Sequence, residues 1–120
     1  MHRKTAIVAS MLLLAAAVAL AGNDAGTLKK VEPSKVCMIN EQFMDKEQIP
    51  VEVEGKTYFG CCEMCKKALA GDPNTRHAVD PVSGKTVDKA VAVIGADAKG
   101  KVFYFENEKN LKKYNARKKA

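Results

Sequence analysis

The feature that most constrains the fold of this chain is an order of elements that occurs twice: a hairpin of two short strands, then a helix. In the first half, apolar and polar residues alternate over 51–54, a Gly-Lys pair at 55–56 marks a turn, and an extended run follows over 57–59. The stretch 61–70 loses this alternation, is rich in helix formers and ends at a Gly-Asp-Pro sequence over 71–73. These patterns predict a β-hairpin followed by a short helix.

The second half of the chain repeats this order. Residues 91–94 and 101–105 are strand candidates on either side of a turn over 95–100, and a helix from about Glu108 to Tyr114 follows, with Asn107 as its N-cap. We therefore predict an α+β fold made of two small β-hairpin-plus-helix modules in tandem. Chance similarity is the alternative, because turns and aromatic residues recur at such spacings in unrelated chains.

An alignment of the two modules on their Gly-Lys pairs shows what the second copy lacks. Cys61 meets Glu106 and Cys65 meets Asn110 in this alignment, and the opening Val36-Cys37 of the first module corresponds to Val82-Ser83 in the second, so none of the three positions keeps a thiol. The second module is therefore expected to pack against the first without holding a metal.

These patterns also predict the boundaries. A cysteine-bearing module over residues 35–71 and a degenerate module over residues 78–116 follow a polar linker over residues 22–34, and a basic tail over residues 117–120 ends the chain. Much of the apolar surface of the second module is expected to come from its strand residues, namely Val91, Val93, Val102, Phe103 and Phe105.

The first 21 residues predict a secretory signal peptide. Arg3 and Lys4 place positive charge ahead of an apolar stretch over residues 6–20, and Ala19 and Ala21 supply the small residues of a cleavage site. A retained membrane anchor is the alternative, but the stretch is short of the roughly 20 residues that span a bilayer and is rich in alanine. We expect a periplasmic or secreted mature chain without stable membrane insertion.

Size and charge limit the functions that such a mature chain can have. Removal of the first 21 of 120 residues leaves 99, enough for one small domain or two very small ones sharing a core. The formal charge of +6 falls to about +4 without Arg3 and Lys4, and an exported chain of this mild charge is not expected to bind nucleic acid. No Ser-His-Asp set, phosphate loop or carboxylate pair occurs, so we do not expect an enzyme.

The four cysteines are the candidate metal ligands: Cys37, Cys61, Cys62 and Cys65. If the last three open a helix, Cys61 and Cys65 share one face and Cys62 borders the same cluster. A lone cysteine ahead of a hairpin and further cysteines at the next helix start are the parts of a treble-clef-like metal site. The helix dipole favours thiolates there, and thiolates prefer soft or borderline ions. We therefore expect the site to bind one such ion, Cu(I) or Zn(II).

Other sulfur and nitrogen ligands lie near these cysteines in the sequence. Met38 and Met64 adjoin ligand candidates, and thioether sulfur would favour copper over zinc, although core packing is the commoner role of methionine. His77 is the only histidine that remains after signal cleavage, and a lone histidine is more often a surface or packed residue than a ligand. Copper is therefore the first expectation and zinc the second.

Two sets of motifs carry a resemblance to a known family. The first half contains Val36-Cys37-Met38 and then Gly55-Lys56-x-Tyr58-Phe59-Gly60-Cys61-Cys62-x-x-Cys65-Lys66. The second half contains Asp80-Pro81-Val82-Ser83-Gly84-Lys85 and then Gly100-Lys101-x-Phe103-Tyr104-Phe105. At these residues the chain resembles the TRASH and YHS group of small treble-clef modules, over roughly residues 34–70 and, more weakly, 80–114. The group is named for trafficking, resistance and sensing of heavy metals.

The resemblance implies which residues bind the metal. The ligands of the group fall on Cys37, Cys61 and Cys65, and Cys62 matches the doubled cysteine of some members. The chain departs from the pattern at Ser34, where many members have a further cysteine or aspartate. A four-ligand site would therefore need Cys62 to turn inward, or a fourth ligand from a histidine, a methionine, water or a partner.

Gly60 is a second departure, because the group usually has an aromatic residue immediately before the cysteine pair.

Disulfide bonds are the main alternative to a metal. A bond between the adjacent Cys61 and Cys62 would be strained, which leaves Cys37 paired with Cys61 and Cys62 with Cys65, or Cys37 with Cys62 and Cys61 with Cys65. Either pairing would make the chain a scaffold or interaction module without metal. A thiol-disulfide enzyme is less consistent with the sequence, since no βαβ pattern surrounds the Cys-x-x-Cys spacing.

Taken together, these patterns predict an exported heavy-metal-binding protein. It would hold or pass copper or zinc by reversible thiolate coordination, with an envelope protein that delivers or accepts the ion as its partner.

Overall fold

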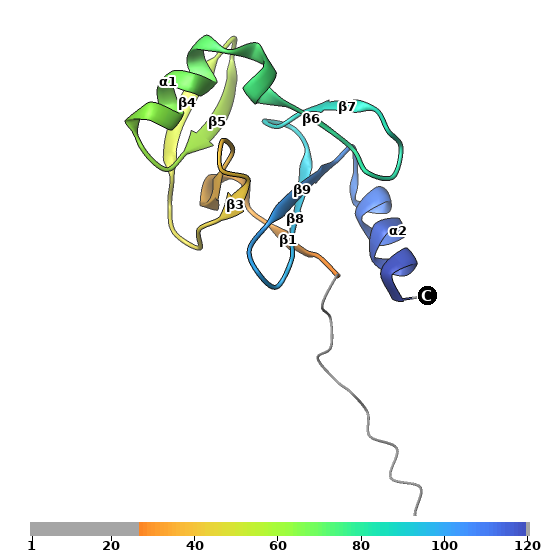
Figure 1. Cartoon of the computed structure of the whole chain (residues 1–120). Helices are drawn as coiled ribbons and strands as arrows, with labels where there is room; N and C mark the ends of the chain where they lie inside the picture. The colour runs from red at the N-terminus through yellow and green to blue at the C-terminus, as the bar shows by residue number, and fades with distance from the viewer. Residues whose placement is uncertain (1–26, 120) are drawn as a thin grey trace, which may run out of the picture.

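Within residues 27–119, the part of the chain that the structure describes, two α-helices combine with small antiparallel strand pairs (Figure 1). This computed structural model confirms the predicted α+β class. The predicted signal peptide over residues 1–21 lies outside the described residues. Neither described helix is long and apolar enough to cross a bilayer.

The first half contains the predicted hairpin and helix. Strand β4 (Ile49–Val53) pairs with β5 (Lys56–Gly60), and helix α1 (Glu63–Gly71) follows. Glu54 and Gly55 join the strands with φ angles of 52° and 79°, the left-handed region that a two-residue type I′ turn needs. Glycine adopts this region without strain, which explains its place in the turn.

A second, smaller hairpin lies ahead of β4. A short 3₁₀ turn, Pro33–Lys35, leads into β2 (Val36–Cys37), which pairs with β3 (Gln42–Phe43). The backbone N–H of Phe43 donates to the carbonyl oxygen of Gly100 at 2.7 Å, so this hairpin is hydrogen-bonded to the second half of the chain.

The second half has two hairpins and a helix. After the 3₁₀ turn Pro73–Arg76 come β6 (His77–Val79), β7 (Thr86–Asp88), β8 (Val93–Ala96), β9 (Val102–Phe105) and α2 (Glu108–Lys119). The prediction that Asn107 is the N-cap of α2 is confirmed, because its Oδ1 accepts the backbone N–H of Asn110 at 2.9 Å. Helix α2 continues to Lys119 and so includes most of the predicted basic tail over residues 117–120.

The strand predicted over residues 91–94 begins later than expected. Asp88 turns the chain here: its Oδ1 accepts the N–H of Ala90 at 2.9 Å, and its carbonyl accepts the N–H of Val91 and Ala92 at 3.1 and 3.0 Å. Val91 is therefore 68% exposed, and its predicted contribution to the core is wrong. Local side-chain to backbone bonds of this kind compete with strand pairing.

The linker predicted over residues 22–34 also differs from the structure. Lys29–Val31 forms β1, which pairs antiparallel with β8, and the three-stranded sheet has the order β1-β8-β9. Leu28, just before β1, is buried with Phe105 and Leu111 under α2. Residues 28–31 thus belong to the packed second half, which the polar composition of their neighbours conceals.

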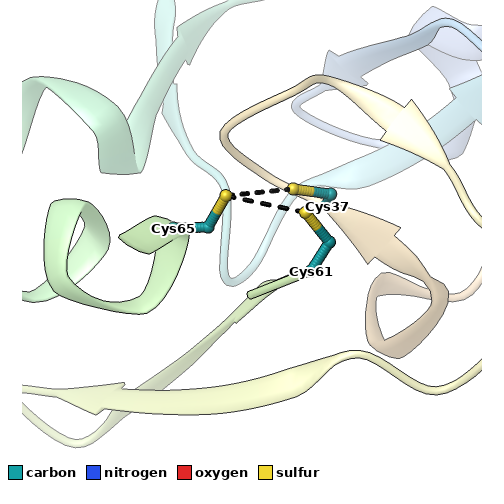
Figure 2. A group of neighbouring side chains, drawn as sticks. All are labelled: Cys37, Cys61 and Cys65. Carbon is teal, nitrogen blue, oxygen red and sulfur yellow. Dashed lines mark hydrogen bonds between the residues drawn. The ribbon is translucent and has the colours of Figure 1, made fainter. Parts of the chain in front are cut away.

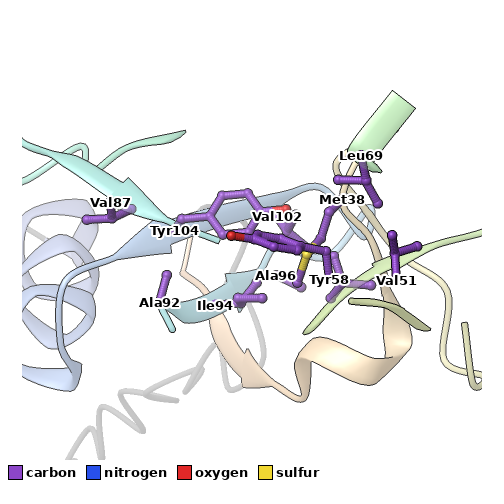
Figure 3. Packing of buried hydrophobic residues seen from close by; sticks show 11 residues of the cluster. Met38, Val51, Tyr58, Leu69, Val87, Ala92, Ile94, Ala96, Val102 and Tyr104 are labelled. Carbon is purple, nitrogen blue, oxygen red and sulfur yellow. The ribbon is translucent and has the colours of Figure 1, made fainter. Parts of the chain in front are cut away.

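The two halves share one hydrophobic core (Figure 3). It combines buried side chains of the first half with buried side chains of the second: Val36, Met38, Val51, Tyr58 and Leu69 with Val87, Ala92, Ile94, Ala96, Val102 and Tyr104. Each buried aliphatic or aromatic side chain contributes on the order of 2 kcal/mol. Neither half therefore has this core to itself.

Two sets of polar contacts join the same halves. The Tyr58 hydroxyl donates to the Asp88 carboxylate at 2.8 Å, and the Lys56 ammonium is 2.8 Å from the same group. Lys89, only 4% exposed, donates from Nζ to the Met38 carbonyl at 2.8 Å and pairs with Glu41. Lys89 thus holds the loop between β2 and β3, which directly follows Cys37.

Candidate metal centre

Three of the predicted ligands meet at one point. Cys37 ends β2, Cys61 follows the last residue of β5, and Cys65 lies in the first turns of α1. Their Sγ atoms all lie within 4.8 Å of one another, with Cys65 at 3.8 Å from Cys37 and 3.6 Å from Cys61. Figure 2 shows the three side chains pointing toward one another from three separate elements.

These sulfur positions suit one metal ion. A metal–sulfur bond of about 2.3 Å places the sulfurs of a tetrahedral zinc site roughly 3.8 Å apart. The distances of 3.6 and 3.8 Å from Cys65 therefore need little adjustment on binding. A disulfide needs about 2.05 Å between sulfurs, and all four cysteines are free thiols, so neither predicted disulfide pairing is formed.

Cys62, the fourth predicted ligand, lies at the margin of this group. It is the N-cap residue of α1 and is exposed, and its Sγ is 3.5 Å from that of Cys65. The sequence argument placed both Cys61 and Cys62 inside the helix, but α1 begins at Glu63. Cys61 therefore reaches Cys65 from the end of β5 and not from the same helical face.

Gly60 explains how the end of β5 and α1 come so close. A Cβ atom on Gly60 would lie 2.9 Å from Cβ of Cys65 and 3.3 Å from its backbone carbonyl carbon. Real side chains do not approach so closely, so only glycine fits here without a shift of α1. The departure of Gly60 from the family pattern is thus part of the local geometry that brings Cys61 and Cys65 together.

Replacement of Gly60 should therefore weaken metal binding. In Gly60→Ala the new methyl group must push α1 away from β5, and we expect affinity for Cu(I) to fall at least about tenfold. Competition with a chromogenic copper chelator measures this. Gly71→Ala is the matched control, because a Cβ there has no atom within 4 Å, and it should bind as the native chain does. Equal affinities in the two variants would refute this account of Gly60.

The thiols of the group differ in acidity. Burial disfavours the thiolate of Cys37, but the backbone N–H groups of Asn40, Ile39 and Cys61 outweigh it and hold its pKa below the ordinary value. Burial and the three neighbouring thiols raise the pKa of Cys65 to about 12. An ion bound by all three sulfurs must therefore displace protons.

Asn40 is a site residue that sequence reasoning missed. Its backbone N–H donates to Cys37 Sγ at 3.5 Å and its side-chain Nδ2 donates to Cys61 Sγ at 3.4 Å. Asn40 thus contacts two of the three thiols and orients them, as residues that hydrogen-bond to the ligands do in known metal sites. The available signal was a polar side chain three residues after the first cysteine, in the turn between two strands.

The other candidate ligands lie elsewhere. Met38 is fully buried in the shared core, whereas Met64 is 80% exposed. His77 is exposed at the start of β6, with Nδ1 at 2.9 Å from the carbonyl oxygen of Pro73, and it is not in the thiol group. Among the described residues, only the three clustered cysteines form a group of at least three close metal-ligating side chains.

Asp80 is the counterpart of Cys37 in the second half. Its Oδ1 accepts the backbone N–H groups of the residues two and three positions later, Val82 and Ser83, at 2.7 and 3.1 Å. Cys37 likewise faces the N–H groups two and three positions later. The hydrogen bonds therefore match Cys37 with Asp80, and not with Ser83 as the sequence alignment had it.

Asp80 also contacts the two residues that align with Cys61 and Cys65. Its Oδ2 accepts the backbone N–H of Glu106 at 2.8 Å and the side-chain amide of Asn110 at 2.9 Å. Although burial disfavours the charge, these donors hold the pKa of Asp80 below its usual range. Four hydrogen bonds use the acceptor capacity of this carboxylate and hold the turn after β6 against the start of α2.

Acid should destabilise the protein through Asp80 and Asp88. Burial would raise the pKa of Asp88, but Lys56, the N–H of Ala90 and Tyr58 lower it overall. A carboxyl with a lowered folded pKa stabilises the fold above its unfolded pKa of about 3.9 and loses this contribution as the pH falls through the folded pKa.

Urea unfolding followed by circular dichroism should therefore show equal stability at about pH 7 and 5 and a decline below about pH 4. The decline should be shallower in Asp88→Asn. Stability that rises on acidification would contradict the assignment.

Comparisons with protein-family models, with curated proteins and with solved structures found no match for this chain. The resemblance drawn from the sequence motifs therefore remains a prediction, and the functional argument depends on the geometry of the thiols.

Proposed function

We propose that this protein binds a heavy-metal ion through Cys37, Cys61 and Cys65 and holds or passes it on without chemical change. The observation that carries the proposal is the convergence of three sulfur atoms within 4.8 Å from three separate elements. Each of the three cysteines is a free thiol, so its sulfur is available to an ion.

Copper in the Cu(I) state fits best, and Zn(II) is the second choice. Thiolates select both ions, but structural zinc sites almost always have four protein ligands. Three sulfurs make up the close group, while the fourth cysteine is exposed at its margin. A soft ion that accepts three thiolates suits this arrangement.

The setting of this function is part of the same proposal. The N-terminal pattern of charged, apolar and small residues supports export to the periplasm or beyond the cell. The motifs around the cysteines support membership of the TRASH and YHS group. The donor set favours reversible coordination over catalysis, and the partner would be an envelope protein that delivers or receives the ion.

The test is a metal titration of the purified, fully reduced mature chain. Under anaerobic conditions, addition of Cu(I) should give thiolate-to-copper absorption in the near ultraviolet that saturates at one ion per chain, and the ion should persist through gel filtration. Elemental analysis and intact mass measure the same ratio. If the chain retained neither Cu(I) nor Zn(II) at micromolar concentration, the proposal would be overturned.

The same samples distinguish the disulfide alternative. A chain purified from the export compartment that is lighter by four hydrogens and contains no metal would be a disulfide-bonded scaffold. Four titratable thiols with bound metal would support the proposal.

A further inference from the structure

Cys62 differs from the other three cysteines in its access to solvent. Cys37 and Cys65 are 0% and 6% exposed and Cys61 is partly buried, whereas Cys62 is exposed. Its Sγ nevertheless lies 3.5 Å from that of Cys65, a separation at which both sulfurs can bind one ion. Cys62 is thus in contact with both the thiol group and the solvent.

Burial creates a difficulty for the exchange of a bound ion. An ion held by several thiolates leaves slowly unless an incoming ligand binds as an old one departs, and an incoming ligand cannot reach buried sulfur. A thiolate of a partner cannot contact Cys37 or Cys65 directly, because both side chains are almost completely covered. Asn40 further occupies one side of Cys61 through its Nδ2 contact at 3.4 Å.

We infer that Cys62 is the exchange ligand that moves the ion between the three-sulfur site and a thiolate carried by a donor or acceptor outside. This inference rests on the proposed metal-binding function. The partner is a molecule with a solvent-accessible thiolate and affinity for Cu(I), whether a small thiol or a cysteine on a protein surface.

The exchange conserves atoms and charge. A bond from Cys62 Sγ to the ion forms as the bond from one buried sulfur breaks, Cys62 gives its proton to water, and the released thiolate takes one up. The thiolate of the partner then binds the ion at the exposed side as the remaining bonds break in turn. Copper stays Cu(I) throughout, so no oxidant or reductant is needed.

A Cys62→Ser variant separates exchange from binding. Copper would be supplied as its complex with glutathione and withdrawn with a chromogenic Cu(I) chelator, with both rates followed by stopped-flow absorption. We expect the variant to hold one Cu(I) with affinity within about threefold of the native chain, while both rates fall at least about tenfold. Met64→Ala is the control, because this neighbour is also exposed, and its rates should stay native.

The outcomes are distinguishable. If Cys62→Ser loses the ion or binds it more than about tenfold more weakly, Cys62 is a permanent ligand and the inference is wrong. If the variant binds and exchanges at the native rates, Cys62 has no role in exchange, and the inference is again wrong while the proposed function stands. If the native chain takes up no Cu(I), the proposed function and this inference both fail.

Discussion

A Cys61→Ser, Cys65→Ser double variant should take up no Cu(I) under conditions in which the native chain binds one ion. Both residues belong to the group of three sulfurs within 4.8 Å, and serine offers a hydroxyl that soft ions bind poorly. If about 10 kcal/mol of binding is shared by three thiolates, each single change should weaken binding by on the order of a hundredfold or more. Titration against a chromogenic Cu(I) chelator covers this range of affinity.

The control for these changes is Ser83→Ala. Ser83 is exposed in the second half, where the sequence alignment placed it opposite Cys37, and its side chain only accepts the backbone N–H of Lys85 at 3.2 Å. It should bind Cu(I) as the native chain does. Retention of one tightly bound ion by the Cys61→Ser, Cys65→Ser variant would place the metal elsewhere and remove the basis of the proposed function.

Asp80→Ala should have the largest effect on stability. The change leaves four donors without their acceptor, the backbone N–H groups of Val82, Ser83 and Glu106 and the side chain of Asn110. Asp80 is fully buried, so water does not replace the carboxylate without rearrangement. Since each unsatisfied buried donor costs about 1 to 3 kcal/mol, we expect a loss of roughly 4 kcal/mol or more, a large part of the stability of a small domain.

Urea unfolding followed by circular dichroism measures this loss. Asp72→Ala is the matched control, because Asp72 is exposed and its side chain accepts one backbone N–H, that of Asn74, at 3.0 Å. It should cost no more than about 1 kcal/mol. If Asp80→Ala had the same free energy of unfolding as Asp72→Ala, the hydrogen bonds of Asp80 would not stabilise the second half.

Local patterns predicted the elements of this fold well where local chemistry decides them. The alternation over residues 51–54 and the Gly-Lys turn gave the β4–β5 hairpin, and Asn107 marked the start of α2. They failed for β1, which forms because the distant strand β8 offers it an edge, a pairing that neighbouring residues do not reveal. They also failed at Val91, where a local turn made by Asp88 replaces the start of the predicted strand and leaves Val91 exposed.

The same distinction applies to the candidate site. The spacing of Cys37, Cys61 and Cys65 predicted that their thiols meet, and they do. Asn40 was missed because an asparagine in a turn is ordinary in sequence, and only the fold shows that it contacts two sulfurs. Asp80 was missed because the alignment compared residue types, whereas a carboxylate can replace a thiol by accepting the same backbone donors.

The hydrogen bonds of Asp80 have a consequence for the fold of the protein once the proposed metal ion has left. Many small zinc domains unfold when their ion is removed, because the ion supplies much of the free energy of folding. Here the Asp80 carboxylate, which is part of the chain, holds the second half together through its hydrogen bonds. The hydrophobic core that the two halves share then stabilises the first half as well. Loss of the ion should therefore leave a folded protein whose three sulfurs stay in place, ready for many rounds of loading.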